Sequence, residues 1–249
     1  MKSIREIYKT GKGPSSSHTM GPERAANYFK NAHPQADGFR VILYGSLSKT
    51  GVGHGTDRVL REVLAPVPTE IVFSDEALPA SAHPNTMDFF AYKDGKELAS
   101  LRVASIGGGD IRIPGREDVE GPDIYLENTF AEIADLCKWR YMTRLSDYVE
   151  LYEGPEIWDF LQTVWDTMKA SIDAGLSTTG ILPGGLGVQR KARFLLDQQR
   201  SGEAAPLREC RIISAYAYAV AEQNADNGTI VTAPTCGACG VLPAVLQYF

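Results

Sequence analysis

The stretch MDFFAYKDGKELASLRVASIGGG, residues 87–109, decides the fold of the N-terminal half of the chain. Two runs rich in apolar and aromatic residues flank Asp94-Gly95, and an Asp-Gly pair between such runs is a strong signal for a β-hairpin. Three consecutive glycines, Gly107 to Gly109, end the second run in a tight turn. The sequence therefore predicts an antiparallel hairpin here.

Upstream of the hairpin, helix-like and strand-like segments alternate. Helical composition at 20–30 precedes an apolar run of strand length at 40–47, and a helix at 57–64, which Thr56 can cap, precedes a second strand at 70–73. Together with the hairpin, these segments predict an α/β (α+β) N-terminal domain over residues 1–120.

Strand signals largely vanish from about residue 121. The pattern predicts a connecting helical segment over 121–150 and an all-α domain over 151–249, with helices near 155–175, 188–200 and 208–225. The apolar ending VLPAVLQYF, residues 241–249, resembles a helix just begun, with no polar cap to close it. We therefore expect the all-α domain to be C-terminally truncated; the alternative is a terminal helix or strand docked on the core.

Composition excludes several classes of protein. The chain has 249 residues, 43% of them hydrophobic, and a formal net charge of −6, whereas nucleic-acid-binding surfaces are usually basic. No run of 18 apolar residues exists to span a membrane, and the start MKSIREIYKTG lacks the apolar core of a secretory signal, which predicts a cytoplasmic protein. Four cysteines are too few for a disulfide scaffold.

Two histidine-bearing loops carry the first candidate chemistry. Residues 13–19, GPSSSHT, place hydroxyls and unpaired N–H groups ahead of a helix, where anions such as carboxylates bind. Next to these hydroxyls, His18 adds a group that transfers protons near neutral pH. An ordinary capped turn is the alternative. The hydroxyl-bearing candidates for substrate binding are Ser15, Ser16, Ser17 and Thr19.

The second loop, SLSKTGVGHGT at 46–56, lies between a predicted strand and a predicted helix, where α/β sheets usually bind ligands. His54 sits there between two glycines, but the loop matches neither the dinucleotide nor the P-loop pattern. A single histidine in such a loop is often incidental. Two of them in one small domain favour a shared site, with His54 or His18 as its base.

Four further segments are weaker candidates. HPNT at 83–86 and the glycine turn after the hairpin give Asn85, Gly107 and Gly108 a possible role in lining the site, although both are also ordinary turns. A glycine-rich helix entry lies at 177–187. Cys236 and Cys239 form a C-x-x-C, which suits a cluster ligand, a redox pair or two buried inert thiols.

Taken together and in order, these motifs resemble the bacterial iron–sulfur-dependent L-serine dehydratases. GPSSSHTMGPERAA, KTGVGHGTD, HPNTM and SIGGG are similar to the family's β domain, and GILPGGLGVQRKA and NADNGTIVTAPTCGACGVLPAVL are similar to the first part of its α domain. The resemblance implies a lyase of amino-acid degradation and gluconeogenesis that converts L-serine to pyruvate and ammonia. It also implies a homo-oligomer.

The resemblance implies a [4Fe–4S] cluster in the α domain. Cys236 or Cys239 would be one ligand, and which of them ligates stays open. The family's other cysteines lie mostly beyond this motif, so we expect the truncated chain to be inactive by itself. A Lewis-acidic iron would assist departure of the serine hydroxyl, while His54 or His18 removes the Cα proton.

Three rival functions remain at this stage. A pyridoxal-dependent dehydratase would need a Schiff-base lysine, for which Lys49 is the nominal candidate. A non-catalytic amino-acid-binding module is possible because the chain does not supply a full ligand set. The C-x-x-C also allows a dithiol redox protein.

Overall fold

The computed structural model describes residues 1–116, 122–198 and 201–249. Its N-terminal half is a five-stranded sheet of order β3-β2-β4-β5-β6, in which only β2 and β3 run parallel to each other. The strands are β2 (Gly38–Leu43), β3 (Thr69–Phe73), β4 (Thr86–Lys93), β5 (Lys96–Gly107) and β6 (Asp110–Arg112). The expected hairpin is β4–β5, and Asp94 and Gly95 both adopt the positive φ that its turn requires.

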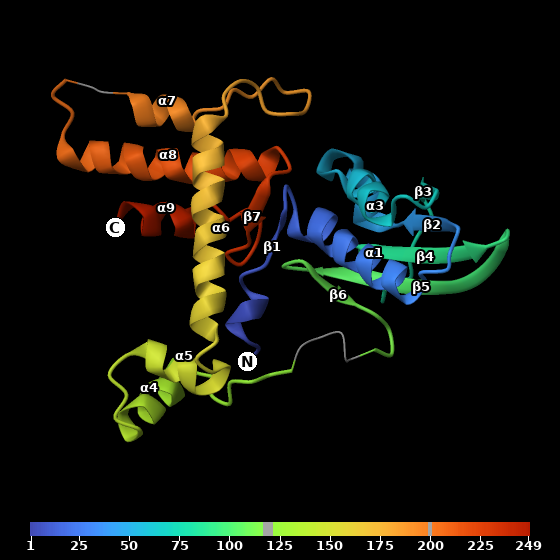
Figure 1. Cartoon of the computed structure of the whole chain (residues 1–249), viewed down its shortest axis with the longest axis horizontal. Coiled ribbons are helices and arrows are strands. Elements are labelled where there is room, and N and C mark those ends of the chain that lie inside the picture. The colour runs from blue at the N-terminus through green and yellow to red at the C-terminus, as the bar shows by residue number, and fades with distance from the viewer. Residues whose placement is uncertain (117–121, 199–200) are drawn as a thin grey trace.

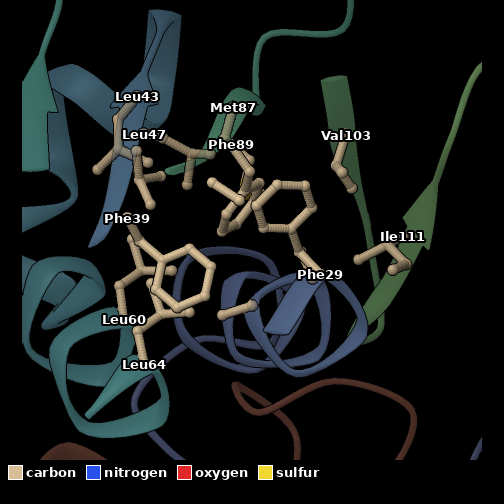
Figure 2. Packing of buried hydrophobic residues seen from close by; sticks show 14 of the residues in the cluster. Phe29, Phe39, Leu43, Leu47, Leu60, Leu64, Met87, Phe89, Val103 and Ile111 are labelled. Carbon is tan, nitrogen blue, oxygen red and sulfur yellow. The ribbon is translucent and has the colours of Figure 1, made fainter. Parts of the chain in front are cut away.

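Helices cover one face of this sheet (Figure 1). They are α1 (Gly21–Ala32) and α3 (Thr56–Leu64), while the short α2 (Gly45–Thr50) follows β2 directly. Figure 2 shows the core between the layers, where Phe29 of α1 faces Phe89 of β4 with ring centroids 5.4 Å apart. Both side chains are fully buried, and each contributes about 1.5–3 kcal/mol from the hydrophobic effect.

The second half is helical, as expected. It comprises α4 (Phe130–Trp139), α5 (Leu145–Glu153), α6 (Ile157–Ser177), α7 (Ala192–Asp197), α8 (Ala205–Ala225) and α9 (Val241–Tyr248). The long helices α6 and α8 cross closely, because Gly175 leaves room for the backbone of Ala219. No helix in the described ranges has the length and apolar character that crossing a membrane requires.

One small sheet joins the two ends of the chain. Strand β1 (Thr10–Lys12) pairs antiparallel with β7 (Thr229–Val231), and Thr10 lies opposite Val231. The side chain of Thr232 adds to this link, because its hydroxyl accepts from the Lys9 N–H and donates to the Ile7 carbonyl. The first residues therefore pack with the helical half.

Several local expectations were wrong. The strand expected over 40–47 ends at Leu43, because Gly45 turns the chain with a φ of +53° into α2. Thr56 is not the cap of α3; Gly55 is, and the Thr56 hydroxyl donates to the backbone carbonyl of His18 instead. Strand β7 had no counterpart in the expectations, since three residues are too short for a periodic signal.

The connecting segment and the helix at 188–200 also differ from expectation. Residues 121–150 contain α4 and the start of α5, separated at Tyr141, which has a positive φ. The predicted helix at 188–200 is reduced to α7, because the residues before it form a hairpin closed by a bridge between Ile181 and Gln189. Residues 199–200 of that prediction lie outside the described ranges.

Candidate active site

Contacts between loops bring the predicted motifs together where the sheet meets the helical half. The first loop runs into a single π-helical turn, η2 (Ser16–Met20), a form often found at functional sites. It contacts the second loop through the Thr56–His18 hydrogen bond of 2.5 Å. It contacts the C-x-x-C segment through the Met20 Sδ, 3.5 Å from the Cys236 Sγ.

Two further motifs, the HPNT turn and the glycine turn after β5, join the same region. The N–H of Ser46 donates to the carbonyl of Pro84 at 2.8 Å, which ties the second loop to the HPNT turn. The side-chain amide of Asn85 donates to the Ser105 carbonyl at 3.3 Å, so the turn also holds the end of β5. A Cβ added at Gly108 would lie 4.0 Å from the carbonyl oxygen of Pro234.

The imidazoles of His18 and His54 are in contact, with ring centroids 4.7 Å apart. His54 ends the short 3₁₀ turn η3 (Val52–His54), and its Nδ1 lies 2.9 Å from the carbonyl oxygen of Thr50. A carbonyl only accepts hydrogen bonds, so the neutral His54 ring carries its proton on Nδ1. Its Nε2 therefore has the free lone pair that a general base needs.

His18 is held differently, because both of its ring nitrogens have hydroxyl partners. Its Nδ1 lies 3.0 Å from the Ser17 Oγ, and its Nε2 lies 3.0 Å from the Ser46 Oγ. Burial lowers the pKa of His18, and the neighbouring His54 lowers it further. His18 is therefore neutral at pH 7, and its two nitrogens are already occupied.

The hydroxyls of the first loop are partly used to build the loop. The Ser15 Oγ accepts the backbone N–H of His18 at 3.1 Å and so caps the turn, and it lies 3.4 Å from the Ser17 Oγ. The buried hydroxyl of Thr19 donates to the His54 carbonyl at 2.9 Å and fixes the two histidine loops together. Ser16 is also buried, at 8% exposure.

The glycine turn after β5 needs its glycines. Gly107 and Gly108 have φ values of +103° and +59°, which residues with a side chain rarely adopt. At the same point, Ser105 is fully buried and its hydroxyl has no partner among the described residues. A Cβ at Gly21 would lie only 2.0 Å from that hydroxyl oxygen, so the start of α1 packs directly on this turn.

The C-x-x-C thiols are deeply buried, Cys236 at 2% exposure and Cys239 at 1%. Burial raises the pKa of Cys236 to about 12 and that of Cys239 to about 11, so both are neutral thiols at pH 7. Metal binding would have to displace their protons. Cys137 lies on α4 and Cys210 on α8.

These residues do not fit a complete iron–sulfur cluster. A cluster held by protein thiolates commonly takes four, and the described ranges contain no group of three or more Cys, His, Asp or Glu side chains placed to hold a metal. The soft sulfur donors of Cys236 and Cys239 match part of such a set.

The sequence assigned no role in the site to Ser46 or Met20. Ser46 falls both at the end of the predicted strand and at the start of the second loop, and the change of backbone direction at Gly45 turns its hydroxyl towards His18. Met20 looked like the apolar start of a helix, but it is 7% exposed and contacts the Cys236 thiol from 216 positions away. Such long-range contacts leave no local signal.

The fold and the site define a two-part protein in which a helix-covered sheet with paired histidines is joined to a helical unit with buried thiols. The family model of the serine dehydratase beta chain matches residues 3–65, and that of the serine dehydratase alpha chain matches residues 70–249. The chain belongs to the serine dehydratase family.

Several curated relatives are named L-serine dehydratase. The chain is 34% identical to L-serine dehydratase TdcG of Escherichia coli in an alignment 303 positions long. It is 33% identical to L-serine dehydratase 2 of the same organism and 32% identical to the L-serine dehydratase of Streptomyces coelicolor. The alignments cover 99–100% of this chain and 66% of each relative. The chain therefore spans just under two thirds of the length of these relatives.

Proposed function

We propose that the chain provides the acid–base part of an L-serine dehydratase, which converts L-serine to pyruvate and ammonia. Membership in the serine dehydratase family and the names of the relatives support this substrate. The observation that carries the proposal is the contact between His18 and His54 at the junction of five loops. Such a pair supplies the proton transfer that an elimination of water needs.

In this proposal His54 is the base that removes the Cα proton of serine. Its Nδ1 proton is directed to the Thr50 carbonyl, so its Nε2 is free to accept. His18 is the weaker candidate, because Ser17 and Ser46 occupy both of its nitrogens. In this proposal His54 is therefore the base with a free lone pair, and His18 is a neutral ring held by two hydroxyls.

We also propose that residues on the same loops bind the substrate. The candidates for holding the carboxylate and ammonium groups are Ser15, Ser16, Ser17, Thr19, Asn85, Gly107 and Gly108. Among these, Ser17 is half-buried and adjacent to the His18 ring. Positive-φ glycines let a carboxylate approach backbone N–H groups closely.

The elimination breaks two bonds of L-serine. The Cα–H bond breaks and its proton moves to the Nε2 of His54, while the Cβ–O bond breaks and hydroxide leaves. The resulting aminoacrylate takes up a proton at Cβ to become an imine, which water hydrolyses to pyruvate and ammonia. Hydroxide is a poor leaving group and needs an electrophile, which is the chemistry that an iron–sulfur cluster supplies when bound.

We further propose Cys236 and Cys239 as candidate thiolate ligands of a [4Fe–4S] cluster. The support is the family, the soft sulfur donors and their link through Met20 to the first histidine loop. Because the described residues supply only part of a ligand set, we expect little turnover from the chain by itself.

Assembly and location are proposed on less direct grounds. A homo-oligomer is supported by large exposed apolar side chains such as Trp139 at 72% and Tyr141 at 92% exposure. A cytoplasmic location fits the free-amino-acid substrate and the free thiols, which a reducing compartment maintains.

Replacing His54 by Gln tests the assignment of the base. Calorimetry should show L-serine binding within about threefold of the unaltered chain, while pyruvate formation after anaerobic supply of iron and sulfide should fall by about 10²–10⁴-fold. The matched control is His33→Gln, because His33 is the C-cap at the far end of α1. Turnover equal to that of the control would remove His54 from the mechanism.

One alternative function has a specific observation in its favour. The incomplete donor set suits a module that binds serine without converting it. Serine binding without pyruvate, even after iron and sulfide are supplied, would favour that module. A pyridoxal enzyme is less well supported, because Lys49 is exposed whereas Schiff-base lysines are usually desolvated.

A further inference from the structure

The short helix α2 contacts both histidines. At its start, Gly45 has a φ of +53°, and a Cβ there would lie 2.5 Å from the Pro84 carbonyl oxygen. Glycine is therefore required at this position, and it turns the next residue, Ser46, towards the first histidine loop. The helix follows β2 directly, so the sheet core fixes its position.

Ser46 uses all three of its polar groups. Its N–H donates to the Pro84 carbonyl at 2.8 Å, its Oγ lies 3.0 Å from the Nε2 of His18, and its carbonyl accepts the Thr50 hydroxyl at 2.8 Å. Ser46 thus contacts both the HPNT turn and the imidazole of His18 directly. Ser46 therefore links three of the five loops.

The other end of α2 holds the second histidine. Thr50 is four residues after Ser46, and its carbonyl oxygen is the partner of the His54 Nδ1. The hydrogen bond from the Thr50 hydroxyl to the Ser46 carbonyl ties this end of α2 to the first. One helical turn thus sets the positions of both imidazoles.

We propose that Ser46 is a positioning residue that holds the Nε2 side of the His18 ring and, through α2, sets the placement of His18 against His54. This inference rests on the proposed function, because it describes how the two histidines of that site acquire different roles. Ser46 acts on His18 directly and on His54 only through Thr50.

Ser17, the other hydrogen-bond partner of the His18 ring, does not link that ring to a different element. Ser17 is the sequence neighbour of His18 and lies on the same π-helical turn, so it moves together with the ring it contacts. Ser46 comes from an element 28 positions away, and that element also holds His54. Of the two hydroxyl partners of the His18 ring, it is therefore Ser46 that links this ring to the element holding His54.

The Ser17 and Ser46 hydroxyls hold the His18 ring from both sides. A neutral imidazole has one N–H, so one nitrogen of His18 donates and the other accepts. Hydroxyls donate or accept as required, so both remain partners of the ring in either tautomer. Removing the Ser46 hydroxyl leaves the Nε2 of His18 without this partner, and of the two hydroxyls only that of Ser17 then holds the ring.

The test compares Ser46→Ala with Ser46→Thr, which keeps a hydroxyl, and with Ser48→Ala as the control. Ser48 lies on the same helix, but its side chain makes no hydrogen bond to any residue that the structure describes. Long-range ¹H–¹⁵N spectra of histidine-labelled protein at pH 7.5 report the tautomer of each ring directly. Melting temperatures are recorded in parallel to separate positioning from general loss of structure.

We expect Ser46→Ala to shift the His18 ring-nitrogen signals, because the Nε2 loses its partner, and to change the His54 signals, with a melting temperature close to that of the control. Ser46→Thr should restore the His18 signals of the unaltered chain. L-serine affinity should fall by up to about tenfold in Ser46→Ala, the effect of one lost hydrogen bond. Unchanged His18 nitrogen signals in Ser46→Ala would overturn the proposal.

The spectroscopic result does not depend on the substrate. If the unaltered chain bound no L-serine, the proposed function would fail, while the tautomer measurement would still decide whether Ser46 positions His18. If serine bound normally and the His18 signals did not respond to Ser46→Ala, only the present inference would fail.

Discussion

The crossing of α6 and α8 allows a sharp prediction at Gly175. A Cβ built there would lie 2.2 Å from the carbonyl oxygen of Ala219, 2.5 Å from its carbonyl carbon and 2.7 Å from its Cα. Ordinary contacts of a Cβ begin near 3.4 Å, so Gly175→Ala requires the helices to separate by about 1 Å. The obstructing atoms are backbone, so no side-chain rotation relieves the overlap.

The expected cost follows from two opposing effects. Overpacking of this kind destabilises by about 1–3 kcal/mol. Alanine regains up to about 1 kcal/mol of helix propensity relative to glycine. With the middle of the first range, the net loss should be about 1 kcal/mol, which for a chain of this size lowers the melting temperature by about 2–4 °C.

Calorimetric or circular-dichroism melting of Gly175→Ala tests this value. Gly185→Ala is the matched control, because a Cβ at Gly185 meets nothing within 4 Å and its φ is not positive. A melting temperature for Gly175→Ala equal to or above that of Gly185→Ala would refute the reasoning about the α6–α8 contact.

Two further predictions concern the site. Iodoacetamide at pH 7.5 should modify the exposed Cys210 at least about 100-fold faster than Cys236 and Cys239, because burial keeps the latter two as neutral thiols. Peptide mass spectrometry after timed quenching measures the modification rates. Equal labelling of the three cysteines would contradict the burial described. For His18, the lowered pKa means that its contribution to stability is present above its unfolded value of about 6.5 and is lost as the pH falls through its folded value. Between pH 7.5 and 5 the melting temperature should therefore fall further for the unaltered chain than for His18→Gln, and parallel curves would argue against a neutral, buried His18.

Local patterns predicted the parts of the fold that depend on local physics. The Asp94-Gly95 turn, the strand β3 and the helix α6 follow from turn chemistry and apolar periodicity, and the structure has them close to the expected residues. The short helix α2 could not be predicted, because its existence depends on a glycine with positive φ and on a contact with Pro84.

In the candidate site too, the residues could be predicted from local sequence but their tertiary contacts could not. The sequence singled out both histidines, and the structure places their rings in contact. Their different hydrogen-bond partners could not be predicted, because the Thr50 carbonyl and the Ser46 hydroxyl become partners only once α2 is formed. The roles of the site residues in substrate binding stay predictions.

The pairing of β1 with β7 has a consequence for how the chain matures. Residues 10–12 remain without their strand partner until residues 229–231 have been synthesised, and closing so long a segment is slow and entropically costly. The N-terminal strand is therefore an exposed edge during most of translation, when unpaired strands invite association between neighbouring nascent chains. Cutting the gene near residue 120 to express the halves separately should accordingly yield a helical fragment with an unsatisfied strand, whereas supplying residues 1–12 as a peptide in trans should improve its solubility.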